Sequence, residues 1–198
     1  MSKHTHTSQW NSLFETQKSQ TAENEKNENL IDRYYFIFDC SLNLIEYVNY
    51  SFETIMQYKK EEFTIEKLID IIHPEDKEYF FQSEEKGLKF TNSLSFNEHF
   101  RYFMSYSYRV KTSNGTYIRV RQQCQAIEVN LQGHLTKTLV IHQKIADENR
   151  SDHDYRVFDK YKNIYLDINN FYNLSQRERE ILDLIQQGFN SLQISDIL

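Results

Sequence analysis

The fold of this chain is decided by residues 104–129, MSYSYRVKTSNGTYIRVRQQCQAIEV. In the first half, Tyr106, Tyr108 and Val110 alternate with polar residues. Strict alternation of apolar and polar side chains predicts a strand with one buried face. The dipeptide Asn114-Gly115 is a strong signal for a hairpin turn. A second alternating run follows the turn, so the segment predicts a long antiparallel hairpin.

Further strands flank this hairpin on both sides. Residues 136–143 predict a third strand, with Leu139 and Ile141 on one of its faces. Earlier in the chain, residues 34–38 and 44–49 are rich in strand formers and are separated by a turn-like segment. The pattern therefore predicts a sheet of five antiparallel strands.

The strands are interrupted by helical segments. Residues 50–58 and 59–72 have apolar side chains at helical spacing. Pro74 suits the first position of another helix, because its missing N–H group would have no partner there. We expect that helix to reach Gly87 or Thr91. Strands and helices in this order predict an α+β domain.

Two motifs carry a resemblance to a known family. They are LIDIIHPED at residues 68–76 and NGTYIRV at residues 114–120. With the order of the expected elements, they make residues 32–145 similar to the PAS domain, a common sensor module. The resemblance implies a five-stranded antiparallel sheet with helices on one face. It also implies a cavity between the two layers, which holds either a ligand or a packed core.

The resemblance leaves the use of that cavity open. If it binds a ligand, we expect its lining to include Tyr106, Tyr108, Cys124, Leu139 and Ile141, because apolar and aromatic walls with few polar groups suit such pockets. In the other interpretation, these side chains fill a closed core.

The known cofactors of the family depend on characteristic residues that this sequence lacks at the corresponding positions. Photoactive flavin-binding members carry a reactive cysteine in the helical zone, and residues 50–72 contain none. Haem-binding members commonly use a histidine of the longer helix, and residues 75–92 contain none. We therefore do not expect flavin or haem, whereas a small organic ligand fits.

The last stretch, residues 174–198, predicts two helices joined by a turn. Ser175 and Glu178 have the spacing of a capping box. Gly188 lies where a left-handed residue ends a helix, and Asn190 or Ser191 can begin the next helix.

This stretch, LSQREREILDLIQQGFNSLQISDIL, resembles the start of the LuxR-type helix-turn-helix domain of bacterial transcription regulators. In that family, a third helix enters the DNA major groove, and the sequence ends before it. We therefore expect a truncated form, whose partner is DNA through the missing part and which forms a homodimer. The scaffold residues that carry the match are Leu174, Ser175, Glu178, Ile181, Leu182, Gly188 and Ile194.

The predicted organisation has four parts. Residues 1–31 are a polar leader, either disordered or containing a short helix around Trp10, and residues 32–145 form the PAS-like domain. Residues 146–173 are a linker that allows either a helix or extended structure, and we favour a hairpin through residues 160–163. Residues 174–198 begin the helix-turn-helix unit.

Composition limits the function further. The net charge is −6, and an acidic chain is a poor general binder of phosphate backbones. Cys40 and Cys124 are too few for a disulfide framework or a zinc site. No nucleotide-binding, zinc-protease or serine-hydrolase motif is present, and no apolar run could span a membrane or act as a signal peptide. We therefore expect a cytoplasmic, non-enzymatic regulator. The alternative is a PAS dimerisation or protein-interaction module that binds neither ligand nor DNA in this form.

Overall fold

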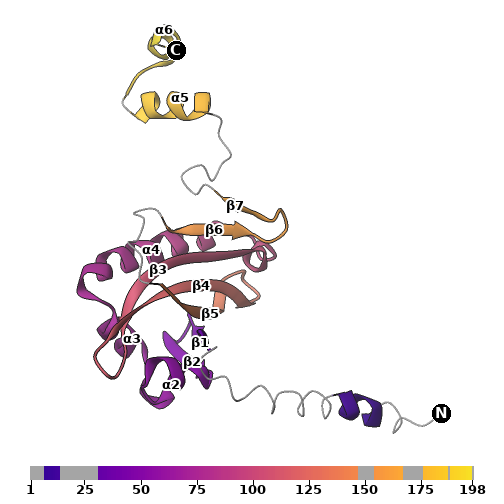
Figure 1. Ribbon diagram of the computed structural model, residues 1–198. Helices are drawn as coiled ribbons and strands as arrows, with labels where there is room; N and C mark the ends of the chain where they lie inside the picture. The colour runs from indigo at the N-terminus through magenta and orange to yellow at the C-terminus, as the bar shows by residue number, and fades with distance from the viewer. Residues whose placement is uncertain (1–6, 14–30, 147–153, 167–175, 187, 198) are drawn as a thin grey trace, which may run out of the picture.

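The computed structural model describes residues 7–13, 31–146, 154–166, 176–186 and 188–197. Within them, seven strands form one antiparallel sheet in the order β2-β1-β5-β4-β3-β6-β7, as Figure 1 shows. The α+β fold is confirmed, but the expected number of five strands is wrong. The strands are β1 (Arg33–Asp39), β2 (Leu44–Val48), β3 (Tyr102–Lys111), β4 (Tyr117–Val129), β5 (Leu135–Ile145), β6 (Arg156–Asp159) and β7 (Ile164–Leu166).

The predicted central hairpin is confirmed as β3 and β4. Tyr108 lies opposite Val120 in the register of the two strands. Gly115 has a φ of 90° at the turn, and Asn114 Oδ1 accepts a hydrogen bond from the backbone N–H of Thr116. A positive φ favours glycine, which has no Cβ to clash. The Asn-Gly pair therefore sets the register of β3 and β4.

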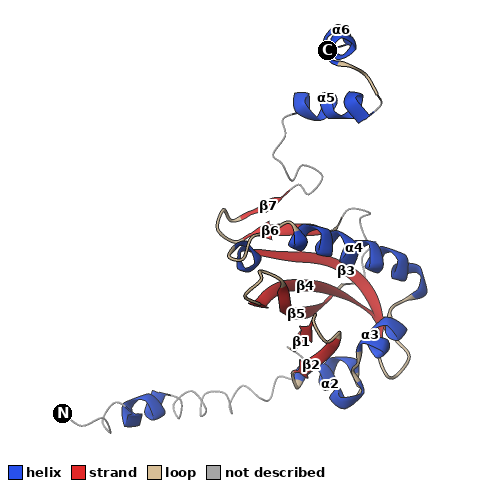
Figure 2. Cartoon of the chain, turned by 180° about the vertical axis from the view of Figure 1, so that it is seen from behind, coloured by secondary structure: helices blue, strands red, loops and turns tan. Residues whose placement is uncertain are grey.

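The helices cover one face of the sheet (Figures 1 and 2). They are α2 (Ser51–Met56), α3 (Ile65–Ile71) and α4 (Pro74–Asn92), with short 3-10 turns at η2 (Lys60–Glu62) and η3 (Glu98–Arg101). At the start of α4, His73 Nδ1 accepts a hydrogen bond from the backbone N–H of Glu75, at 3.3 Å. The core lies between these helices and the sheet, and its largest fully buried apolar side chains include Tyr34, Phe36, Phe52, Met56, Ile72 and Tyr108.

The two additional strands come from the predicted linker. β6 pairs with β3, and β7 pairs with β6, so extended structure was the right alternative for this part of the linker. A sequence signal was available: FDCSLN at residues 38–43 and FDKYKN at residues 158–163 share the pattern F-D-x-x-x-N. In both turns the aspartate side chain accepts hydrogen bonds from the two backbone N–H groups two and three residues on. The same hairpin therefore forms both edges of the sheet.

At the C-terminal end, α5 (Gln176–Gln186) and α6 (Ser191–Ile197) are two helices, as expected. Gly188 has a φ of 89°. Its N–H donates to Ile185, and the N–H of Phe189 donates to Leu184, which is the hydrogen-bond pattern of a Schellman motif. Leu174 and Ser175 lie outside the described residues, so the predicted capping box stays a prediction.

The start of α6 is capped in the predicted way. Asn190 Oδ1 accepts from the N–H groups of Leu192 and Gln193, each at 3.1 Å. Gln193 Oε1 accepts in return from the Asn190 N–H, at 3.0 Å. These reciprocal bonds satisfy amides that otherwise have no partner at a helix start. Ile194 is buried.

The leader contains a short helix at residues 7–13, whose side chains Trp10 and Leu13 are exposed. Most of the other leader residues lie outside the described part of the chain. In that described part, none of the helices combines the length and the apolar character needed to cross a bilayer.

Candidate functional site

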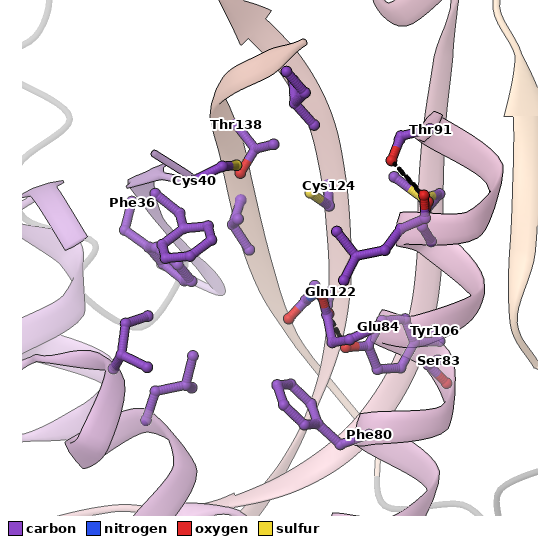
Figure 3. A pocket seen from close by; sticks show the side chains of 18 of the residues that line it. Phe36, Cys40, Phe80, Ser83, Glu84, Thr91, Tyr106, Gln122, Cys124 and Thr138 are labelled. Carbon is purple, nitrogen blue, oxygen red and sulfur yellow. Dashed lines mark hydrogen bonds between the residues drawn. The ribbon is translucent and has the colours of Figure 1, made fainter. Parts of the chain in front are cut away.

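A cavity of about 190 Å³ lies between the helical layer and the inner face of the sheet (Figure 3). Its walls are mainly apolar and aromatic, which is typical of small-molecule pockets. Leu88, at its rim, is 59% exposed, so the cavity reaches the surface beside α4. The lining consists of Phe36, Phe38, Cys40, Ile65, Leu68, Ile69, Phe80, Ser83, Glu84, Gly87, Leu88, Thr91, Met104, Tyr106, Gln122, Cys124, Leu135, Thr138, Val140 and Tyr155.

Of the five residues expected to line the pocket, the structure places two in the cavity wall and three elsewhere. Tyr106 and Cys124 line the cavity. Tyr108 is fully buried in the core, and it does not border the cavity. Leu139 and Ile141 lie on the opposite face of β5, because successive side chains of a strand point to opposite faces.

The error on β5 has a physical cause. The inward side chains of this strand are Thr138, Val140 and His142, all of them buried. Two of the three are polar, so the apolar residues of the pattern were assigned to the wrong face. A buried polar residue is tolerated when it finds a hydrogen-bond partner, and the partners of His142 come from three other strands.

His142 occupies the middle of a buried polar network. Its Nδ1 lies 2.6 Å from Tyr34 Oη, and its Nε2 lies 3.0 Å from Gln122 Oε1 and 3.0 Å from Tyr108 Oη. Gln122 Oε1 can only accept, so the consistent assignment puts the histidine proton on Nε2 and lets Tyr34 donate to Nδ1. Burial lowers the pKa of His142 to about 3, so the ring is neutral at physiological pH.

The network continues to a carboxyl group at the cavity wall. Gln122 Nε2 donates to Glu84 Oε1 at 2.8 Å. Tyr106 Oη donates to the same oxygen. Figure 3 shows Glu84 on α4 pointing toward Gln122 and Tyr106 on the sheet. The polar side chains therefore form a continuous path from Tyr34 on β1 to Glu84 on α4.

Burial and hydrogen bonding act on Glu84 in opposite directions. Removal from water raises its pKa, and the hydrogen bonds from Tyr106 and Gln122 oppose that change. Burial prevails, so the pKa lies above the ordinary value. Glu84 was not predicted as a site residue, because it lies in the polar run Ser83-Glu84-Glu85-Lys86, which is typical of a solvated helix face.

Three buried hydroxyl groups without a hydrogen-bond partner among the described residues also border this cavity. They are Ser83 Oγ, Thr138 Oγ1 and Tyr155 Oη. A buried hydroxyl without a partner costs free energy. These groups are therefore available to a molecule that enters the cavity.

The two thiols at the cavity are not activated. Burial raises the pKa of Cys40 to about 11, and it raises the pKa of Cys124 as well. Since the thiolate is the reactive form, both groups stay protonated at neutral pH. They act as wall atoms of the cavity.

Comparison with known proteins identifies the domain. The family model described as "PAS fold" matches residues 45–142. No curated protein matches the sequence.

Three solved structures illustrate the likeness. A sensory box histidine kinase/response regulator from Burkholderia thailandensis E264 has 18% identity, covers 59% of this chain and 79% of its own, and has a TM-score of 0.44. The N-terminal domain of a diguanylate cyclase with PAS/PAC sensor from Marinobacter aquaeolei has 15% identity, coverages of 57% and 94%, and a TM-score of 0.42. A PAS domain from Colwellia psychrerythraea has 15% identity, coverages of 65% and 98%, and a TM-score of 0.46. The assignment rests on the family match and on the element order, and residues 45–142 of this chain form a PAS domain.

Proposed function

We propose that this chain is part of a bacterial transcription regulator, in which the PAS domain controls a LuxR-type DNA-binding domain that begins near residue 174. The observation that carries the proposal is the turn between α5 and α6. Its Schellman motif at Gly188 and the reciprocal cap at Asn190 are the local geometry that such a scaffold requires. The resemblance of residues 174–198 to that family supplies the function.

The apolar side chains of the helix pair support the same proposal. Leu182, Ile185, Leu192 and Ile197 are exposed. Helices of this length are marginal in water without a packed apolar face. Two short helices that leave this much apolar surface uncovered are suited to receive a further helix, which in the LuxR family is the one that reads DNA.

The proposed mechanism links the two domains through the dimer. A change in ligand occupancy of the cavity, or in the packing of two PAS domains, alters the positions of α5, α6 and the helix that follows them. In a dimer, two recognition helices match two half-sites one helical turn apart on DNA. The acidic chain described here supplies little attraction for phosphate, so the third helix supplies the basic contacts. We propose no catalytic step.

The direct test is DNA binding by a protein in which the proposed third helix follows α6. Gel-shift and fluorescence titrations against fragments of the source genome, repeated at several salt concentrations, are expected to show a specific site. Affinity for that site should fall linearly with salt on logarithmic axes. A protein ending at Leu198 serves as the control and should bind none of the fragments. Failure of the extended protein to bind any fragment would contradict the proposal.

A second candidate function is supported by the outer face of the sheet. Tyr35 and Tyr47 are exposed there, and their ring centroids lie 5.9 Å apart. This face suits a protein partner or a second copy of the chain. Sedimentation that shows a stable dimer, together with no DNA binding by the extended protein, would favour the interaction module over the regulator.

A further inference from the structure

Glu84 is a partly buried acid at the cavity wall, and no described residue gives it a positively charged partner. Among the described residues, its hydrogen bonds come from Tyr106 and Gln122, which are both neutral. A buried carboxylate is ordinarily paired with a cation or a metal, because an isolated charge is costly to remove from water. A positively charged group that enters the cavity would therefore supply a counter-charge that the described residues do not provide.

The two oxygens of this carboxyl group have different surroundings. Both hydrogen bonds end on Oε1, and in the described part of the chain none is made to Oε2. The donors form a directed series, from Tyr34 to His142, then to Gln122 and finally to Oε1 of Glu84. Hydrogen bonds in series polarise one another and favour negative charge on the last acceptor. Oε2 is left to accept from a molecule in the cavity.

The cavity limits the size and the shape of that molecule. A dry engineered cavity of about 150 Å³ holds a benzene molecule, so the volume of about 190 Å³ here has room for one ring and a short arm. The rings of Phe36, Phe38 and Phe80 border this space. Aromatic faces attract organic cations as well as apolar groups.

We propose that the cavity binds a small organic ammonium ion, with an apolar body of about one ring, whose N–H group donates to Oε2 of Glu84. This inference rests on the proposed sensory use of the cavity, and it is independent of DNA binding. The apolar body occupies the space between α3, α4 and the sheet. The ammonium group supplies the positive counter-charge for the Glu84 carboxylate.

The same geometry disfavours anionic and neutral ligands. An anion would meet the carboxyl group in an environment of low polarity, where like charges repel strongly. A neutral alcohol can donate one hydrogen bond to Oε2, but it leaves the carboxylate without a counter-charge. The discriminating property is therefore the positive charge of the ligand.

The test uses three probes of one size: benzylamine as the cation, benzyl alcohol as the neutral compound and benzoate as the anion. The chain has three methionines, so methionine labelled with ¹³C in its methyl group gives a simple NMR spectrum. Met104 lines the cavity, whereas Met56 is buried elsewhere in the core. Benzylamine at millimolar concentration is expected to shift the Met104 signal and to leave the Met56 signal in place.

Matched variants test whether ligand binding depends on the negative charge of Glu84. Glu84→Gln keeps the size of the side chain, and it should weaken benzylamine binding by at least about tenfold while leaving benzyl alcohol within about threefold. Glu85→Gln removes a neighbouring surface carboxylate that pairs with Lys89, and it should leave both affinities unchanged. Wild-type protein should prefer benzylamine to benzyl alcohol by about tenfold or more.

Several outcomes would overturn the proposal. They are equal binding of the amine and the alcohol, preference for benzoate, unchanged amine binding by Glu84→Gln, and no shift of Met104 with benzylamine. The circular dichroism and urea unfolding of each variant establish that it is folded. A negative result leaves the DNA-binding test unaffected, because no DNA is present in this assay.

Discussion

Asp76, at the start of α4, is held by Arg109 of β3 through three hydrogen bonds. Asp76 Oδ2 accepts from the Arg109 backbone N–H at 2.8 Å and from Nε at 2.9 Å, and Oδ1 accepts from Nη2 at 2.8 Å. Asp76 is buried, and Arg109 lowers its pKa through hydrogen bonds and charge, against the effect of burial. The HPED motif therefore does more than begin a helix, because it attaches α4 to the strand that forms one wall of the cavity.

Removing this attachment should destabilise the domain. Asp76→Asn leaves the Arg109 guanidinium without its buried partner, and we expect a loss of about 2–3 kcal/mol in the free energy of unfolding. Glu75→Gln is the matched control, because Glu75 bonds the same guanidinium at 2.9 Å from an exposed position. An exposed pair contributes little. Urea unfolding measures both variants, and equal losses would contradict the assigned role.

His142 should make stability depend on pH. Burial lowers its pKa to about 3 in the folded chain, from an ordinary value of about 6.5. Below about pH 6.5 the unfolded chain binds a proton that the folded chain excludes, so this stability is complete above pH 6.5 and is lost as the pH falls toward 3. The expected loss from this residue is about 2 kcal/mol between pH 7 and pH 5.

The measurement is urea unfolding of wild-type protein and of His142→Gln at pH 7, 6 and 5. Glutamine offers one acceptor and one donor group in place of the two ring nitrogens. The variant is expected to be less stable at pH 7, and its stability should fall less steeply with decreasing pH. Parallel curves for the two proteins would show that His142 does not carry the effect.

The two edge hairpins should differ in their dependence on aspartate. Asp159 is 1% exposed and binds Arg101 as well as two turn amides, and its pKa falls to about 2, chiefly through the hydrogen bond from Arg101. Asp159→Ala should destabilise β6 and β7 by about 2–3 kcal/mol. Asp39→Ala, which removes the same two turn bonds from the other hairpin, should cost about 1 kcal/mol.

Hydrogen exchange with mass spectrometry locates these effects. Faster exchange in Asp159→Ala should be confined to residues 156–166, because edge strands can open without the rest of the sheet. An increase spread evenly over all seven described strands would instead show that the second hairpin is part of the global folding unit.

The helix pair depends on its cap. Asn190→Ala removes the acceptor of two amides at the start of α6, and we expect a loss of about 1 kcal/mol in the local stability of that helix. Hydrogen exchange at residues 191–194 reports the change. Ser191→Ala, next to the cap, is the control and should have a smaller effect. Equal exchange in the wild-type protein and in Asn190→Ala would exclude the capping role.

Local patterns were enough to predict the elements that depend on neighbours in the chain. The β3–β4 hairpin follows from its alternation and from Asn114-Gly115, and the start of α4 follows from Pro74. The turn between α5 and α6 follows from Gly188 and Asn190. In each case the deciding contact lies within a few residues, so the local sequence is enough to specify these elements and, through their order, the PAS fold.

The roles of Glu84 and His142 depend on the tertiary structure. From the sequence, Glu84 is predicted to be a surface residue of a helix. His142 is predicted to be an isolated histidine on the polar side of a strand. They become parts of one buried network because β1, β3, β4, β5 and α4 bring partners together from positions up to 108 residues apart. A polar side chain is stable in a core only when such distant partners are present. No local pattern contains that information, and this is why the cavity wall on β5 and the acid that faces the cavity were found only in the folded chain.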